Sequence, residues 1–308
     1  LYDVVLDYQE AARLIDALPF RSVKGTTGTQ DSFLELFDGD HAKVRRLERL
    51  VAAKMGFRRI VPVSGQTYTR KLDSQVLGAL VGIAESGHKM GTDIRLLSNL
   101  RELSEPFGSK QIGSSAMPHK RNPMRCERMC SLARHVIAVA QTAPMTAATQ
   151  WLERTLDDSA GRRIAIPEAF LGADAILILA TNVARGMAVH PDVIARRLAD
   201  EAPFLATERV LMAAVKAGGD RQALHERLRR HAVAARTRML DGEPNDLADR
   251  LRGDGAFADV RGRIDELMDP DRLAGRAPRQ VTEFLRSVVR PILRRDAGLL
   301  GIDSSLNV

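Results

Sequence analysis

Long runs of apolar residues at helical spacing constrain this chain more than any other feature. Apolar side chains recur three or four residues apart over 166–187, which places them on one face of a helix. Pro167, near the start of this run, is suited to a first helical turn. Similar runs cover 72–100 and, after Pro123, 129–140. Three long helices, each with one apolar face, predict a helical bundle.

Extended strands are not expected. No stretch alternates apolar and polar residues for long, and Pro62 interrupts the short apolar segment 60–63, so it is a poor strand candidate. The sequence therefore predicts an all-α chain. Ser86 and Asp93 interrupt the apolar run over 72–100 and suggest that this helix carries polar side chains inward.

The pattern changes after His190. Shorter helical segments follow, separated by turns that contain glycine and proline, and such a change marks a domain boundary near residue 189. We therefore expect a central long-helix bundle over 1–189 and a smaller C-terminal helical domain over 190–308.

The positive charge of the chain favours an anionic partner. The net charge is +7 and the isoelectric point is near 9.8, which suits a nucleotide or another anion. The arginines are dispersed along helical segments such as 227–230, and only one Trp and three Tyr are present to stack on bases. Solvated helix faces explain this pattern better than a nucleic-acid surface does, so no specific binding of DNA or RNA is expected.

Composition also bears on metals and location. Cys126 and Cys130 are four residues apart and lack the further ligands of a zinc site, so reduced core thiols and no metal are predicted. The longest apolar stretches, such as 175–180, fall short of the roughly 18 residues of a spanning helix. A cytoplasmic location without membrane contact is the expectation.

The segment 113–123, called the signature loop below, carries the most informative residues. It reads Gly-Ser-Ser-Ala-Met-Pro-His-Lys-Arg-Asn-Pro, a composition that interrupts helices and gathers hydroxyl groups and cations. Loops of this kind often hold functional sites. A helix connector with a basic surface is the alternative from composition alone.

The pattern Gly-Ser-Ser-x-Met-Pro-x-Lys-x-Asn in this loop resembles the signature of the fumarase/aspartase superfamily. The resemblance implies a β-elimination in which Ser114 removes a proton from the β-carbon of the substrate. It also implies that Lys120 and Asn122 hold the neighbouring carboxylate and that Glu127 braces the loop.

The chemistry agrees with these implied roles. A proton beside a carboxylate is weakly acidic, so catalysis needs cations and hydrogen-bond donors directed at the charge that develops there. A serine acts as a base only when its surroundings favour the alkoxide, and Lys120, Arg121 and the amides of a helix that begins after Pro123 make this loop electropositive. On chemistry alone, Ser114 and Ser115 both remain candidates for the base.

Further segments resemble the adenylosuccinate lyases of animals: 24–30, 64–68, 92–95, 113–128, 151–159 and 275–278. This resemblance implies cleavage of adenylosuccinate to AMP and fumarate, and of the succinylated aminoimidazole carboxamide ribotide of purine biosynthesis, without a metal or organic cofactor. The substrate-binding residues that it implies are Gln66, Ser115, Met117, Arg128, Arg154, Ser159 and Arg163.

The residues themselves allow two interpretations of the segment 154–163. Ser159 and Arg163 are one helical turn apart and can share a phosphate with Arg154. Alternatively, Asp157 and Asp158 neutralise an exposed arginine pair. Gln66 likewise either contacts the substrate or lies in a turn that caps the next helix.

The resemblance also sets expectations about what lies outside this chain. Members of the family carry an N-terminal region whose Thr-His segment supplies the general acid, and no histidine here matches it, so we expect the chain alone to be inactive or nearly so. The family forms homotetramers whose active sites are shared between chains. Argininosuccinate lyase activity and a non-catalytic helical scaffold are the alternatives.

Overall fold

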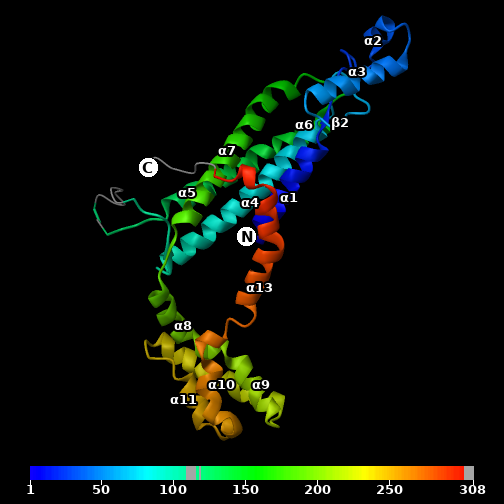
Figure 1. Ribbon diagram of the computed structural model, residues 1–308. Coiled ribbons are helices and arrows are strands. Elements are labelled where there is room, and N and C mark those ends of the chain that lie inside the picture. Colours follow the sequence, from blue (N-terminus) through cyan, green and yellow to red (C-terminus); the bar gives the residue numbers. More distant parts are fainter. Residues whose placement is uncertain (109–115, 118, 302–308) are drawn as a thin grey trace. The chain divides into compact units, whose positions relative to one another are not determined.

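The computed structural model describes residues 1–108, 116–117 and 119–301, and it confirms the all-α class (Figure 1). The described residues divide into two compact units, 1–188 and 189–301, which we treat separately. The strands that accompany the helices are each two residues long.

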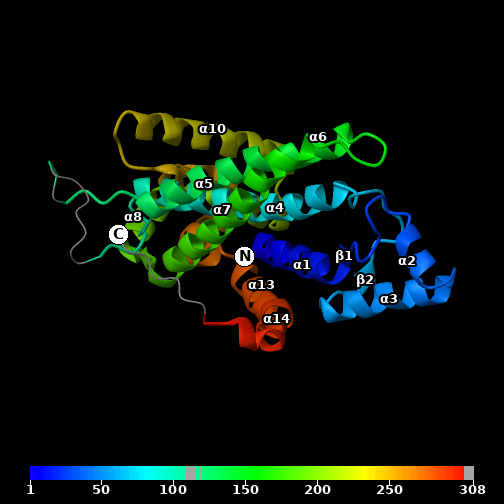
Figure 2. The ribbon, with the colours of Figure 1, turned by 90° about the horizontal axis from the view of Figure 1, so that it is seen from above.

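Unit 1 is built on long helices. Its elements are α1 (Tyr2–Ala17), β1 (Pro19–Phe20), α2 (Asp31–Leu36), α3 (His41–Lys54), β2 (Arg59–Ile60), α4 (Lys71–Asn99), β3 (Leu103–Ser104), α5 (Met124–Ala140), α6 (Thr142–Thr149) and α7 (Asp158–Gly186). β4 (Ala188–Val189) lies at the division between the units. Both views show α4, α5 and α7 running side by side (Figures 1 and 2).

Small residues let these three helices approach closely. A Cβ on Gly87 of α4 would come within 2.4 Å of the Ile176 side chain of α7, and one on Gly172 of α7 would come within 2.6 Å of Val136 of α5. Leu77, Met129, Ile176 and Val183 are almost fully buried in the shared core. Glycine at these contacts therefore sets the helix spacing, because any larger residue would push the helices apart.

The predicted start of α7 is wrong, and its predicted apolar face through Ile166, Phe170, Ala173, Leu177 and Ala180 is only partly right, because Ile166, Ala173 and Ala180 do pack in the core. The helix begins at Asp158 and contains Pro167 in its interior, and Phe170 and Leu177 are 49% and 46% exposed. Its buried positions are mostly small: Ala165, Ala169, Gly172, Ala173, Ile176, Leu179 and Val183. The sequence pattern placed large apolar side chains in the core. Close helix packing instead places small residues inward and leaves several large apolar side chains of α7 on the surface.

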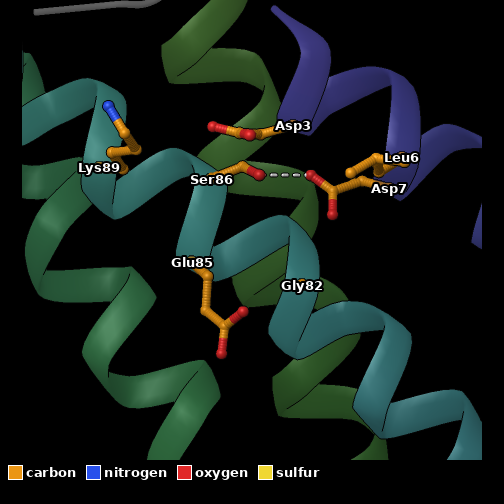
Figure 3. Close-up of a pocket in the computed structure, with 7 residues that line it drawn as sticks. All are labelled: Asp3, Leu6, Asp7, Gly82, Glu85, Ser86 and Lys89. Atoms are coloured by element: carbon orange, nitrogen blue, oxygen red, sulfur yellow. Dashed lines mark hydrogen bonds between the residues drawn. The ribbon is translucent and has the colours of Figure 1, made fainter.

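The expectation that Ser86 and Asp93 point into the bundle is also wrong. The Ser86 hydroxyl donates a hydrogen bond to Asp7 of α1 at 2.5 Å, and exposed Asp93 pairs with Lys89 at 2.7 Å. Ser86 lines a shallow pocket of about 410 Å³ between α1 and α4 (Figure 3). The other residues that line this pocket are Asp3, Leu6, Asp7, Gly82, Glu85 and Lys89. These polar residues therefore lie outside the α4–α5–α7 core.

α7 alone among the described helices is long and apolar enough to span a membrane by length and composition, with a mean hydropathy of 1.8 over 18 residues. Its buried face packs against α4 and α5. We therefore interpret it as the core helix of the bundle.

The segment 17–63 forms a small extension of unit 1. β1 and β2 pair in parallel, with Pro19 opposite Arg59 and Phe20 opposite Ile60. The Phe20 ring stacks on Phe57 at 5.0 Å between centroids. The segment 60–63 was expected to be a poor strand candidate. β2 overlaps it by one residue and ends before Pro62.

Unit 2 consists of shorter helices, and those up to residue 273 surround a separate core. Its elements are α8 (Pro191–Leu205), α9 (Thr207–Lys216), α10 (Arg221–Leu240), α11 (Leu247–Gly253), the 3-10 helix η1 (Gly255–Arg263), α12 (Ile264–Met268), the 3-10 helix η2 (Pro270–Arg272), α13 (Ala277–Phe284), the π-helix η3 (Leu285–Val289), α14 (Arg290–Arg295) and the 3-10 helix η4 (Ala297–Leu299). Phe257, Leu247, Leu251 and Ile264 are fully buried at its centre.

One buried carboxylate joins two elements of unit 2. Asp254 accepts hydrogen bonds from Arg227 at 2.9 Å and from the backbone of Ala256 at 2.9 Å, and it lies 2.7 Å from His231. Burial disfavours its ionised form, but the hydrogen bonds from Arg227 and His231 outweigh this effect and lower the pKa of Asp254 to about 2. The carboxylate therefore connects α10 to the start of η1.

We predict that Asp254→Asn lowers the free energy of unfolding by about 2 kcal/mol near neutral pH. A carboxyl group with a lowered folded pKa stabilises the fold above its unfolded pKa and loses that contribution as the pH falls through its folded pKa. The difference from the wild type should therefore be complete above about pH 4 and should shrink towards pH 2. Urea denaturation at a series of pH values measures it.

Asp259→Asn is the control for this prediction, because Asp259 is an exposed carboxylate in η1. It should change stability little at any pH. Equal effects of the two substitutions would contradict the role of Asp254.

Candidate active site

Three loops from distant parts of the sequence meet at one end of unit 1, beside the starts of α4 and α7. A Cβ on Gly28 would lie 1.8 Å from the Ser64 carbonyl oxygen, and one on Gly65 would lie 3.0 Å from the Glu153 backbone. Arg21 fastens the first two loops by donating hydrogen bonds of 2.8 Å to the carbonyl oxygens of Gly25 and Gly65. Three of the segments singled out from the sequence, 24–30, 64–68 and 151–159, are therefore adjacent in space.

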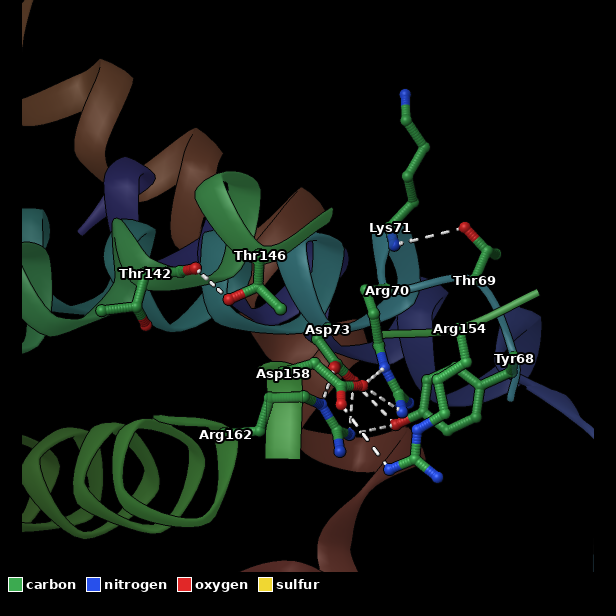
Figure 4. Close-up of polar contacts among 10 residues, drawn as sticks. All are labelled: Tyr68, Thr69, Arg70, Lys71, Asp73, Thr142, Thr146, Arg154, Asp158 and Arg162. Carbon is green, nitrogen blue, oxygen red and sulfur yellow. Dashed lines mark hydrogen bonds and ion pairs between the residues drawn. The ribbon is translucent and has the colours of Figure 1, made fainter. Parts of the chain in front are cut away.

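A set of charged and polar side chains, called the arginine cluster below, lies where these loops enter α4 and α7 (Figure 4). It consists of Tyr68, Arg70, Asp73, Arg154, Asp158 and Arg162. Its centre is the Asp158 carboxylate in the first turn of α7, whose side chain is completely buried. Arg70, which precedes α4, donates a hydrogen bond of 2.5 Å from Nε to Asp158. Arg154 approaches the same carboxylate at 3.6 Å.

The second carboxylate of the cluster is Asp73 in the first turn of α4. Arg162 forms an ion pair with it, and the Tyr68 hydroxyl donates to it at 2.8 Å while accepting from Arg162 at 2.5 Å. Burial, and then the bond to Asp73, raise the pKa of the Tyr68 hydroxyl, and the bond to Asp73 raises the pKa of Arg162. Tyr68 therefore stays protonated and Arg162 stays charged.

The cluster has more cations than anions. Arg70, Arg154 and Arg162 face two carboxylates, and Arg163 adds an exposed guanidinium that forms no hydrogen bond or ion pair within the part of the chain that the structure describes. Ser159 is half-buried in the first turn of α7, and Gln66 is exposed on the loop that precedes Tyr68. Of the sequence-predicted residues, Arg154 belongs to the cluster, while Gln66, Ser159 and Arg163 lie on the segments that supply its members. The three arginines and two carboxylates of the cluster leave a net positive charge, which suits an anion.

The alternative that Asp157 and Asp158 neutralise an exposed arginine pair is half right. Asp158 does pair with Arg154, but it is buried and is already bonded to Arg70. Asp157 is exposed at the start of α7 and caps no backbone group with its side chain. Asp158 is therefore engaged inside the cluster, whereas Asp157 adds an exposed negative charge at the same helix end.

The remaining predicted residues lie at the start of α5. Lys120, Asn122, Glu127 and Arg128 are all exposed, and Met117 is 45% exposed. Ser114 and Ser115 lie outside the described residues.

Two contacts fix the described ends of this segment. The buried carboxylate of Glu105 accepts hydrogen bonds of 2.9 and 3.1 Å from the backbone amides of Arg125 and Cys126, the free donors of the first turn of α5. Arg121 lies over the Phe107 ring at 4.9 Å. Glu105 therefore brings the chain on both sides of the signature loop together.

The two groups of predicted residues lie far apart within one chain. Gly91 of α4 lies against Cys126 and Cys130 of α5, whereas Arg70 of the arginine cluster directly precedes α4, 21 residues before Gly91. At 1.5 Å per residue this separation is about 30 Å along the bundle. The start of α5 and the arginine cluster therefore lie at different places along the length of α4.

Several residues that build the site were missed from the sequence. Arg70, Asp73, Arg162 and Glu105 had no motif of their own, although Arg70 follows the segment 64–68 by two residues. Cys126 and Cys130 are free and buried, and burial, with a smaller effect of Glu105, raises the pKa of the Cys126 thiol to about 12. Within residues 1–108, 116–117 and 119–301, no cluster of three or more His, Cys, Asp or Glu side chains can hold a metal ion.

Comparison with known proteins finds the same family among the relatives of this chain that the sequence motifs resemble. The family described as "Adenylosuccinate lyase C-terminus" matches residues 203–284, and the family described as "Lyase" matches 39–138. Adenylosuccinate lyase of Saccharomyces cerevisiae is 48% identical over 96% of this chain and 61% of its own length. That of Schistosoma mansoni is 46% identical over 100% of this chain and 65% of its own length. The chain therefore spans about three fifths of these relatives.

Solved structures support the fold. The 3-carboxy-cis,cis-muconate lactonizing enzyme from Pseudomonas putida superposes with a TM-score of 0.74 at 22% identity, covering 91% of this chain and 60% of its own. A fumarate lyase from Mesorhizobium sp. BNC1 gives the same TM-score and identity over 92% of this chain and 62% of its own. At this identity the likeness shows the architecture alone.

We predict that Gly28→Ala destabilises unit 1 by well over 1 kcal/mol, because its methyl group would overlap the Ser64 carbonyl as well as disfavour the backbone at φ +89°. Gly39→Ala is the matched control. Gly39 has a similar φ of +80° but no neighbouring atom within 4 Å, so it should lose only about 1 kcal/mol. Thermal unfolding of both variants measures the difference, and equal losses would contradict the close contact between the loops.

Proposed function

Because the chain belongs to the adenylosuccinate lyase family of the fumarase/aspartase superfamily, we propose that it supplies most of a carbon–nitrogen lyase that releases fumarate from adenylosuccinate and leaves AMP. The same chemistry would cleave the succinylated aminoimidazole carboxamide ribotide of purine biosynthesis. The observation that carries this proposal is the arginine cluster, in which three arginines face two carboxylates where the resemblance segments 64–68 and 151–159 lead into α4 and α7.

The arginine cluster suits the phosphate of the nucleotide. Arg154 and Arg163 provide guanidinium groups that can each donate two parallel hydrogen bonds to a phosphate, and Ser159 adds a hydroxyl donor. Gln66 lies on the adjoining loop and offers an amide to the purine or ribose. These residues hold a substrate that bears a phosphate, which an argininosuccinate lyase would not require.

The signature loop is proposed to carry out the elimination. A serine base, Ser114, takes the proton from the β-carbon, and the electron pair of that bond forms the double bond of fumarate. The carbon–nitrogen bond then breaks with its electrons moving to nitrogen, which takes a proton from an acid. Lys120 and Asn122 stabilise the negative charge that spreads onto the carboxylate, and Arg128 and Met117 complete the substrate contacts.

Glu127 is proposed to brace this loop from the first turn of α5. It lies next to Cys126, whose backbone amide is fixed by Glu105. Ser115, beside the base, is proposed as a further donor to substrate. Since the reaction moves protons rather than electrons, these roles require neither a metal nor an organic cofactor.

We further propose that copies of the chain assemble as a homotetramer in the cytoplasm and share active sites. The separation of about 30 Å along α4 between Arg70 and Gly91, which contacts the start of α5, supports completion of one site by different copies. Large apolar side chains are also exposed on unit 1, as a helical interface requires. They include Leu96, Met145, Trp151, Leu156, Ile164, Phe170 and Leu171. Sedimentation measures the assembly, and a monomer at micromolar concentration would contradict it.

A non-catalytic scaffold is the second candidate function. The exposed apolar helix faces support it, since they suit association whether or not catalysis occurs. The substitution Ser114→Ala separates the two functions. It should abolish the cleavage of adenylosuccinate by a lyase, whereas a scaffold shows no cleavage with or without the substitution.

We predict that the chain, mixed with the portion of the yeast relative that it does not match, cleaves adenylosuccinate, and that Ser114→Ala in the same mixture lowers kcat by at least about a hundredfold. The absorbance change on cleavage measures the rate. The chain alone is expected to be inactive or nearly so.

Ser104→Ala is the control for this substitution, because Ser104 lies in the two-residue strand β3 and outside the signature loop. It should leave the rate near that of the wild type. No cleavage by the wild-type mixture, with the two fragments shown to associate, would favour the scaffold.

A further inference from the structure

Asp158 occupies an unusual place for a charged residue. Its side chain is completely buried, in the first turn of α7, directly before Ser159. A buried carboxylate is costly unless it is paired, and Asp158 faces two arginines from different segments (Figure 4). The function proposed above assigns roles to Arg154, Ser159 and Arg163 but none to this carboxylate.

Arg70 holds Asp158 in place. The Arg70 side chain is 5% exposed, donates from Nε at 2.5 Å to Oδ2 of Asp158, and lies over the Tyr68 ring at 4.7 Å. Its guanidinium is therefore held by the carboxylate on one side and by the aromatic face on the other. Because Arg70 is enclosed and already paired, it is a counter-ion for Asp158 and not a ligand for substrate.

Arg154 is held much less tightly. Its Nη2 lies 3.6 Å from Oδ1 of Asp158, beyond hydrogen-bond distance, and its side chain is 23% exposed. Arg154 Nε and Asp158 Oδ1 are both buried without a hydrogen-bond partner in the described part of the chain. One side of the guanidinium thus faces a fixed negative charge, while the exposed part of the side chain can meet an anion.

We propose that Asp158 is a positioning residue that orients Arg154 towards the phosphate of the nucleotide. Its carboxylate attracts one edge of the Arg154 guanidinium, so that the other edge is presented beside Ser159. This inference rests on the proposed function, because the phosphate is that of the proposed substrate and product. Arg70 acts indirectly, because it holds the Asp158 carboxylate in place.

Electrostatics alone gives the opposite expectation for removing this carboxylate. An aspartate beside an anion repels it, so neutralising Asp158 should tighten phosphate binding if charge were the only effect. If Asp158 orients Arg154, neutralising it should weaken phosphate binding, because Arg154 would then have to be ordered at the moment of binding. The sign of the change therefore distinguishes the two roles.

The chain also offers a matched control. Asp157 is the preceding residue, carries the same charge and is exposed, with no side-chain bond to the helix end. Asp157→Asn removes the same charge from nearly the same place without touching Arg154. It should leave binding unchanged or slightly tighter.

The test is calorimetric titration of AMP and of adenosine into the assembled protein, for the wild type, Asp158→Asn and Asp157→Asn. Asp158→Asn should weaken AMP binding about tenfold and leave adenosine binding unchanged. The change should appear as a higher KM for adenylosuccinate with little change in kcat. An AMP affinity equal to or tighter than that of the wild type would overturn the positioning role.

Two further outcomes are informative. If the wild type binds AMP no more tightly than adenosine, the proposed phosphate grip is wrong, and the role of Asp158 fails with it. If the wild type prefers AMP and Asp158→Asn behaves like Asp157→Asn, the proposed function stands and only the positioning role fails.

Asp158→Asn leaves Arg70 buried with a weaker partner, so folding is checked first by circular dichroism. Should this variant not fold, the double substitution Arg70→Leu with Asp158→Asn removes both buried charges together. The same loss of AMP affinity is expected from it, because Arg154 again lacks its carboxylate. Unchanged AMP affinity in the folded double variant would overturn the proposal.

Discussion

The buried pair of Asp158 and Arg70 is the interaction on which the site end of unit 1 depends. It joins the first turn of α7 to the residue that precedes α4, across 88 positions of sequence. Two charges this deeply buried are stable only together, so the pair fixes how the two helices begin relative to each other. This arrangement also sets the positions of Gln66, Arg154 and Ser159. Gln66 lies just before α4, Arg154 lies just before α7, and Ser159 lies in the first turn of α7.

The length of the bundle is the second constraint, and it links the fold to the proposed function. α4 carries the arginine cluster at one end and packs against the start of α5 at the other. A rigid helix cannot shorten, so this separation supports the proposal that the residues assigned to phosphate binding and those assigned to elimination act in sites completed by different copies. The exposed apolar side chains of α7 provide surface for the proposed association.

The sequence predicted the all-α class and the adenylosuccinate lyase family, and both are confirmed. It could not predict which face of α7 is buried, because close packing selects Ala169 and Gly172 over Phe170. It also missed Arg70, Asp73 and Arg162, since an isolated arginine or aspartate has no periodic pattern and acquires its partner only through tertiary contact. The roles of Lys120, Glu127 and the signature serines remain predictions from motif resemblance.

Mixing two inactive variants tests the central claim, that different copies complete one site, most directly. Arg163→Ala removes a proposed phosphate ligand and Lys120→Ala removes a proposed catalytic residue of the signature loop, so neither protein alone should cleave adenylosuccinate at an appreciable rate. After dissociation and joint reassembly, some sites should receive an intact residue set from two different copies, and activity should return. Mixed oligomers that are demonstrably formed yet inactive would contradict the account.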